Sequence, residues 1–302
     1  MRTLRAVLLG LLLPSVGLAH EIVAAGTRTE GSEALLLSIL FGVGIWYAFG
    51  ASRVFKFSVV GRGALMRRFV LFAAAWATLA LSLLTPLHEL GSRSFTAHMI
   101  EHELLMLVAA PLIAFSEPLG IFLWALPKSW RQASGKVGHN ATFSRAWQIV
   151  SGLLAASIIQ AIMLWLWHVP ALFDRALDSE GWHIAQHLSF VLSAILFWWS
   201  IHRAARVHKH AGAAAAFLFF TSLHTSLLGA FMSFAASPWY AEYVALGLSG
   251  TAGLSPLEDQ QLAGLIMWIP GGAVHAIAAL IYFSRSLVTS TQVSSRQWQS
   301  AS

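Results

Sequence analysis

The stretch that decides the fold is HMIEHELLMLVAAP, residues 98–111, in which a histidine-rich segment opens a long apolar run. A helix over this stretch would place His98, His102 and Met106 on one face, because side chains four residues apart are neighbours on an α-helix. The same spacing returns at His183 and His187, which also open an apolar run. Two imidazoles and a thioether suit copper, so we expect a metal or cofactor site where these helices begin.

The composition places the chain among polytopic membrane proteins. Of its 302 residues, 57% are hydrophobic and only 11% are charged, which is too few for the surface of a soluble domain of this size. In a membrane protein, the basic residues behind the net charge of +6 set the orientation of the spans, so no nucleic-acid partner is expected. The chain has no cysteine, which excludes thiolate zinc sites, iron–sulfur clusters and disulfides. A metal site must use His, Met, Asp or Glu.

The amino terminus has the layout of a cleavable signal peptide. Arg2 and Arg5 precede a short apolar run, and Gly17-Leu18-Ala19 forms a small-residue cleavage site. Cleavage after Ala19 would make His20 the first residue, and its amine and imidazole could together chelate Cu(II). A histidine that merely follows the cleavage site is the simpler interpretation.

Seven later runs are long enough to cross a bilayer, at residues 32–50, 68–87, 98–115, 147–168, 183–201, 212–236 and 261–284. The predicted fold is an all-α, polytopic membrane bundle of seven helices. The predicted organisation is a signal peptide over 1–19, an extracytoplasmic segment over 20–31, the seven-helix domain over 32–285 and a cytoplasmic tail over 286–302.

Basic residues predict the orientation of the bundle. They concentrate between the first and second, third and fourth, and fifth and sixth runs, and after the seventh. Only Arg28, Arg93 and Arg175 fall on the opposite side. The positive-inside rule then places the amino terminus outside the cell and the carboxyl terminus in the cytoplasm, as expected for a multi-pass protein of the bacterial plasma membrane.

The predicted outer end is rich in potential metal ligands. With this topology it carries His88, His98, His102, His168, His183 and His187, and the outer halves of the spans carry Met99, Met106, Met163, Met232 and Met267. A single rim histidine such as His88 is usually a solvated interfacial residue, and membrane methionines usually pack. His202, His208 and His210 lie among basic residues and are expected to belong to a positive cytoplasmic loop. Two i, i+4 histidine pairs at helix starts are harder to explain as packing.

Other functions remain open on the residues alone. His224 and His275 lie deep in the last two spans, where they could ligate a haem or hydrogen-bond across helices. His98-Met99-Ile100-Glu101-His102 also fits H-x-x-E-H, the inverted zinc-protease pattern, which would need a third ligand such as Glu180, Glu258 or Asp259. A copper permease would need polar residues through the whole membrane depth, and only His224 and His275 offer these.

Four blocks of sequence together resemble the CtaG-type, seven-span cytochrome c oxidase assembly factor family. The first two are His98-x-x-x-His102 with Leu104-Leu105-Met106 and Ala110-Pro111-Leu112, and Trp167-His168-x-Pro170-x-Leu172-Phe173. The others are His183-x-x-x-His187 leading to Phe197-Trp198-Trp199, and the segment from Gly253-Leu254-Ser255-Pro256 to Met267-Trp268-x-Pro270-Gly271-Gly272. The chain has Ser200 where the family usually has proline.

The resemblance implies a non-catalytic membrane protein that matures a haem–copper oxidase by supporting copper insertion. Its partners would be cytochrome c oxidase subunits and membrane lipid. Carried over by position, the implied metal-site residues are His98, His102, His168, His183, His187 and Asp259. Asp259 would orient a ligand histidine, cap the last span, or do both.

Overall fold

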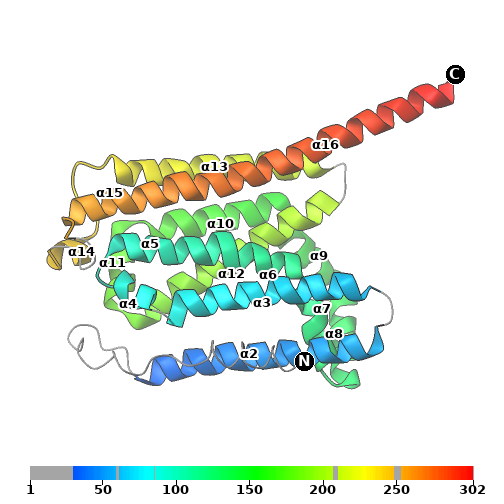
Figure 1. Cartoon of the computed structure of the whole chain (residues 1–302), viewed down its shortest axis with the longest axis horizontal. Helices are drawn as coiled ribbons and strands as arrows, with labels where there is room; N and C mark the ends of the chain where they lie inside the picture. Colours follow the sequence, from blue (N-terminus) through cyan, green and yellow to red (C-terminus); the bar gives the residue numbers. More distant parts are fainter. Residues whose placement is uncertain (1–29, 59–60, 85, 207–209, 248–252, 302) are drawn as a thin grey trace, which may run out of the picture. The chain divides into compact units, whose positions relative to one another are not determined.

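The computed structural model describes residues 30–58, 61–84, 86–206, 210–247 and 253–301, and every regular element in these ranges is a helix (Figure 1). The predicted signal peptide and His20 lie outside the described residues. The chain divides into two units, residues 1–35 and 36–302, and all the packing discussed below lies within the second unit.

The first half of the helices leads from the amino-terminal span to a bent pair. In order they are α2 (Glu30–Phe57), α3 (Arg62–Leu84), α4 (Pro86–Gly91), α5 (Phe95–Glu103), the π-helix η1 (Leu104–Ala109), α6 (Ala110–Ser116), α7 (Pro118–Ala125), α8 (Lys128–His139) and α9 (Ala141–Val150). The second half comprises α10 (Leu153–Trp167), α11 (Pro170–Asp178), α12 (Glu180–Arg206), α13 (Ala211–Ser233), α14 (Ala241–Ala245), α15 (Pro256–Ile266), the π-helix η3 (Met267–Gly271) and α16 (Gly272–Ala301).

The described helices make a multi-span membrane protein. Six stretches are long and apolar enough to cross a bilayer: Leu37–Phe57, Arg62–Leu84, Phe95–Ser116, Glu180–Arg206, Ala211–Ser233 and Pro256–Leu287. The pair α9 and α10 makes a seventh if it counts as one span, although its two parts are bent by 59°. The all-α fold with membrane-spanning helices is therefore confirmed. The signal peptide and the orientation stay predictions.

The fourth predicted span, 147–168, is wrong as a continuous helix. Gly152 adopts an extended conformation (φ −70°, ψ 152°) between α9 and α10, and the Ser151 hydroxyl donates to the Trp147 carbonyl, 2.6 Å away. This side-chain bond satisfies a carbonyl at the end of α9, so the chain can turn there without an unpaired backbone group. Only the part after the bend forms a straight apolar helix.

The helix predicted for residues 98–111 is also interrupted. The α-helix ends at Glu103, and a π-helical turn fills Leu104–Ala109 before α6 begins. Pro111 explains the wider turn, because its ring crowds the preceding turn and its nitrogen cannot donate to the carbonyl four residues earlier. The extra residue in the turn moves Met106 out of the simple His98–His102 face. Met106 instead lies in the apolar core with Met99.

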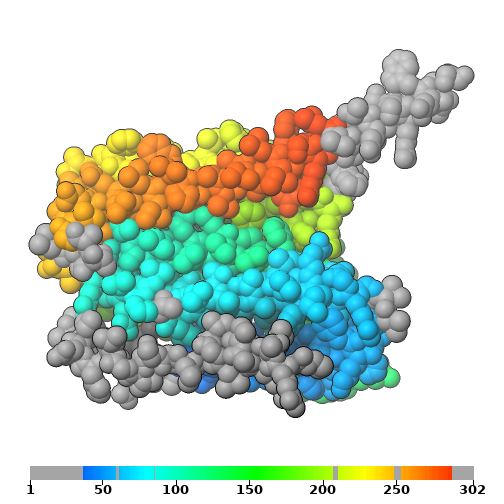
Figure 2. All heavy atoms as spheres, in the orientation of Figure 1, coloured from blue at the N-terminus to red at the C-terminus, as the bar shows by residue number. Residues whose placement is uncertain are grey.

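The third and seventh spans lie side by side and run in the same direction. Asp259 near the start of α15 contacts the start of α5, and further along Gly271 contacts Glu103. The seventh span is interrupted at this depth too, because η3 contains Pro270. On its other side it packs along α13, and Figure 2 shows these elements as adjacent yellow and orange surfaces. Each of the two spans therefore has a proline-associated π turn next to the contact between Glu103 and Gly271.

The far end of the bundle is held by ion pairs around Glu117, the residue between α6 and α7. Its carboxylate pairs with Arg68 of α3 and with Arg206 of α12, and one oxygen lies 3.2 Å from Nε2 of His202. His202 was predicted to lie in a basic loop, and this is wrong because α12 extends to Arg206. Residues Lys128–His139 near this end form the exposed helix α8, none of whose side chains is buried.

Candidate metal site

The helix that carries His98 and His102 is fixed at its amino terminus by a distant carboxylate. Asp259 accepts hydrogen bonds from the Phe95 nitrogen at 2.6 Å and the Thr96 nitrogen at 3.2 Å, and from the Ser94 hydroxyl at 3.0 Å. The first turn of an α-helix has unpaired N–H groups and a partial positive charge, both of which a carboxylate satisfies. The seventh span therefore sets the position of α5.

Two further helix starts bring the other histidines to the same place. His183 and His187 lie one turn apart in the first two turns of α12, and His88 lies on the short helix α4. Gly91 ends α4 so close to α5 that an added Cβ would lie 3.4 Å from Cα of His98. Figure 1 shows α4, α5 and α11 at one end of the bundle.

Five imidazoles and one carboxylate form what we call the histidine cluster: His88, His98, His102, His183, His187 and Glu101. Within each helix the paired rings are 4.3 Å apart between centroids, for His98 and His102 and again for His183 and His187. Between helices, His98 lies 5.5 Å from His183 and His102 lies 5.0 Å from His187. Two triads have ligand atoms within 4.8 Å of one another: His98 with His183 and His187, and His88 with Glu101 and His187.

Glu101 is the acidic member of the cluster and is fully buried. Its Oε1 lies 2.7 Å from Nδ1 of His88 and 3.7 Å from Nδ1 of His187. The short contact implies that His88 carries a proton on Nδ1, which leaves its Nε2 lone pair for another partner. Carboxylates commonly hold ligand histidines in this way.

Burial changes across the cluster. His98, His102 and Glu101 are almost inaccessible, at 1%, 1% and 0% exposure, whereas His88, His183 and His187 are only partly buried. Phe173 and Phe190 close the inner side, with ring centroids 5.1 Å from His98 and 4.8 Å from His102 respectively. The cluster thus has an apolar inner side, which we call its floor, and a less buried outer side formed by His88, His183 and His187, which we call its mouth.

His168 follows the last turn of α10 and lies beside the same two phenylalanine rings. Its Nδ1 donates to the Leu164 carbonyl at 2.6 Å, which leaves Nε2 as a buried acceptor without a hydrogen-bond partner in the described residues. Burial lowers the pKa of His168 to about 4, although the Leu164 carbonyl opposes this shift. His168 is within electrostatic reach of His98 and His102 but belongs to neither triad.

Asp259 also stands apart from the triads, because its two oxygens accept the hydrogen bonds at the start of α5. The sequence suggested that Asp259 caps the last span, but Asp259 is not the N-cap residue of its own helix. Ser255 caps α15 in a capping box with Glu258. The hydrogen bonds of Asp259 thus reach the candidate site through the start of α5, from the Ser94 hydroxyl and the backbone nitrogens of Phe95 and Thr96.

Sequence reasoning missed the roles of His88 and Glu101. His88 was expected to be a solvated rim residue, but it is half-buried and bonded to Glu101. The available signal was the position of Glu101, three residues after His98 and therefore on nearly the same helix face. Nothing in the sequence indicated that His88 on α4 is the partner of Glu101, because this contact depends on how the chain turns between α4 and α5.

The donors of the cluster fit a transition-metal ion. Nε2 of His98 and both ring nitrogens of His102 are buried without hydrogen-bond partners in the described part of the chain. A neutral imidazole has one lone pair and one N–H, and leaving both unpaired in an apolar site is costly. Imidazole nitrogens from several helices suit copper or zinc, and a bound ion would satisfy these lone pairs.

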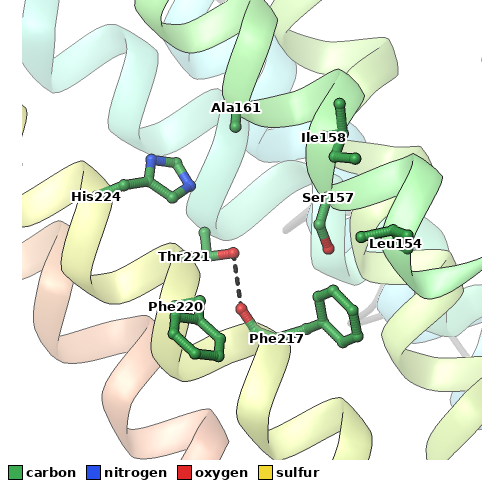
Figure 3. A pocket seen from close by; sticks show the side chains of 8 residues that line it. All are labelled: Leu154, Ser157, Ile158, Ala161, Phe217, Phe220, Thr221 and His224. Carbon is green, nitrogen blue, oxygen red and sulfur yellow. Dashed lines mark hydrogen bonds between the residues drawn. The ribbon is translucent and has the colours of Figure 1, made fainter.

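The other two membrane histidines do not support the haem alternative. His224 accepts a 3.4 Å hydrogen bond from the Trp165 indole and lines a mostly apolar groove between α10 and α13 (Figure 3). His275 is 2% exposed and stacks on Trp198. The protease alternative likewise lacks support, because Glu101 is bonded to histidine in a buried position.

Fold and site together define a polytopic helical membrane protein with a buried histidine cluster at its helix ends. The family described as cytochrome c oxidase caa3 assembly factor (Caa3_CtaG) matches residues 45–288, which include the whole cluster. The chain belongs to this family, as the resemblance predicted. No curated protein and no solved structure matches it.

Proposed function

We propose that this protein collects copper at the histidine cluster and passes it to cytochrome c oxidase during assembly of the enzyme. The observation that carries the proposal is the triad of His98, His183 and His187, whose ligand atoms from two helices lie within 4.8 Å of one another. Membership of an oxidase assembly factor family supports copper as the ion, since haem–copper oxidases need it. Copper is here the cargo and not a resident cofactor, and no turnover is involved.

The burial of the cluster supports transfer. Ligands at the floor would hold the ion in a dry site, while the partly buried His88, His183 and His187 would let it enter and leave. By the positive-inside rule we place this mouth on the extracytoplasmic face of a bacterial plasma membrane. An oxidase subunit at that face would receive the ion.

Copper retention tests the proposal. We would load metal-free protein in detergent with Cu(I), remove loosely bound ions and measure copper per chain in wild type and in His98→Ala/His102→Ala. We expect the double variant to lose the copper ion that is bound at the histidine cluster. The control is His139→Ala on α8, an exposed histidine far along the chain from the cluster. Equal retention in wild type and double variant would remove this pair from the site.

Two further measurements distinguish the alternatives. Deletion of the gene is expected to abolish oxidase activity, and wild-type protein but not the double variant should restore it. A visible spectrum of the same purified sample should show no Soret band, whereas a strong band would favour the haem alternative.

A further inference from the structure

Glu103 carries a second carboxyl group, which contacts the seventh span and has one buried oxygen. A Cβ on Gly271 would lie 2.8 Å from its Oε2 and 3.3 Å from its Oε1, so the carboxylate packs directly on this glycine. Oε2 is buried and has no hydrogen-bond partner among the residues the structure describes. An uncompensated carboxylate in a membrane interior is costly, which is why such residues are usually functional.

His275 contacts the same glycine through the Gly271 carbonyl oxygen. Its Nδ1 lies 2.9 Å from the Gly271 carbonyl oxygen and donates to it, so Nε2 carries the lone pair. The ring stacks on Trp198 with a centroid distance of 5.5 Å and an interplanar angle of 11°. Nε2 is buried and unpartnered in the described residues. The imidazole is therefore held in one orientation, and the lone pair of Nε2 is available to a metal ion.

The backbone between these two groups is irregular and lies near the middle of the membrane. Gly271 ends the π turn that contains Pro270, and it is close to the midpoint of the span Pro256–Leu287. The Ser222 hydroxyl donates to the next carbonyl, that of Gly272, at 2.9 Å. Broken membrane helices with small residues and facing polar side chains are typical of ion sites in membrane proteins.

We propose that Glu103 and His275 bind a second cation beside Gly271, deeper in the membrane than the histidine cluster, and that this site takes the same ion. The ion's identity rests on the proposed function. The position rests on the two unpartnered donors. A carboxylate oxygen and an imidazole nitrogen are both accepted copper ligands, and a bound cation would compensate the charge of a deprotonated Glu103. His102 precedes Glu103 in the chain, so α5 carries one residue of each site.

The test counts copper ions per chain in detergent-purified, metal-free protein titrated with Cu(I) against a coloured chelator. We expect two ions for wild type and one each for Glu103→Gln and His275→Asn. Glutamine keeps the shape of Glu103, and asparagine can still donate to the Gly271 carbonyl. The variant His98→Ala/His183→Ala/His187→Ala should lose the cluster ion and keep the second.

His139→Asn is the matched control, because Nδ1 of His139 also bonds the carbonyl four residues earlier, that of Gly135, at 2.6 Å, but in an exposed helix. It should bind two ions. Wild-type stoichiometry in both Glu103→Gln and His275→Asn would overturn the second site and leave the proposed function intact. Loss of copper only in the cluster variant would likewise overturn the second site. Loss of an ion only in Glu103→Gln and His275→Asn would instead overturn the histidine cluster as a copper site.

Discussion

The carboxylate of Asp259 accepts a 2.6 Å hydrogen bond from the backbone nitrogen of Phe95, a residue 164 positions earlier in the chain. This contact joins the first turn of the seventh span to the first turn of the third, which carries His98 and His102. The site residues on α5 are therefore positioned by a residue that does not face the candidate ion. We therefore expect Asp259 to affect the stability of the fold and the affinity for the ion, but not the number of ions bound.

Asp259→Asn should lower both the thermal stability and the copper affinity, without changing the number of ions bound. Asparagine keeps one accepting oxygen but loses the charge at a helix amino terminus, a change that costs about 1–2 kcal/mol. Thermal midpoints and chelator competition would measure the two effects. Glu258→Gln, in the exposed capping box of α15, is the control. An Asp259→Asn protein with fewer bound ions would instead make Asp259 a ligand.

Glu101→Gln should weaken copper binding about 10- to 100-fold, the usual cost of losing a carboxylate that orients a ligand histidine. The amide has nearly the same size but no charge, and it can present an N–H toward Nδ1 of His88, which would favour the wrong tautomer. Affinity for Cu(I) is the measurement, with Glu180→Gln at the exposed start of α12 as control. Unchanged affinity would mean that Glu101 does not act on the ligands.

The metal-free protein should lose stability as the pH falls from about 6.5 toward 4. The pKa of His168 is lowered to about 4 in the folded chain, while an exposed histidine titrates near 6.5. Between these values the unfolded state binds the extra proton, so the free energy of unfolding rises with pH, by at most about 1.4 kcal/mol per unit for this group. Thermal midpoints across this range, in wild type and His168→Phe, test it. An equally steep dependence in the variant would assign the effect to other groups.

Local periodicity explains what could be predicted from the sequence. The pairs His98–His102 and His183–His187 need only an α-helix to bring their rings together, and both occur at helix starts as expected. The apolar runs likewise indicate spans without knowledge of packing. The predicted helix ends near Arg53 and Arg62 are displaced, because α2 continues past Arg53 and α3 already begins at Arg62. Long basic side chains can reach past a helix end, so they do not mark it.

Tertiary contacts explain what could not be predicted. The bond between His88 and Glu101 and the cap from Asp259 to α5 depend on how separate helices meet, which no local pattern encodes. The π turn after Glu103 follows from Pro111, but a proline alone does not indicate whether a helix will kink, end or widen. The contact of Glu103 with Gly271 joins two spans that each contain such a turn, and it depends on how these spans pack.

Gly264→Ala should destabilise the fold strongly, because α15 and α13 approach so closely that they leave no room for a methyl group. A Cβ on Gly264 would lie 2.6 Å from the Gly229 carbonyl oxygen and 2.7 Å from the Ser233 nitrogen, both backbone atoms that cannot rotate away. Overpacking of this kind costs about 1–3 kcal/mol or more. Gly120→Ala on α7 is the control, since a Cβ there meets nothing within 4 Å, and alanine should stabilise that helix by up to about 1 kcal/mol. Thermal midpoints in detergent should thus move in opposite directions, and a Gly264→Ala midpoint at or above wild type would mean that the two helices do not approach this closely. Because α15 also carries Asp259, copper affinity should fall together with the midpoint in Gly264→Ala and stay unchanged in Gly120→Ala.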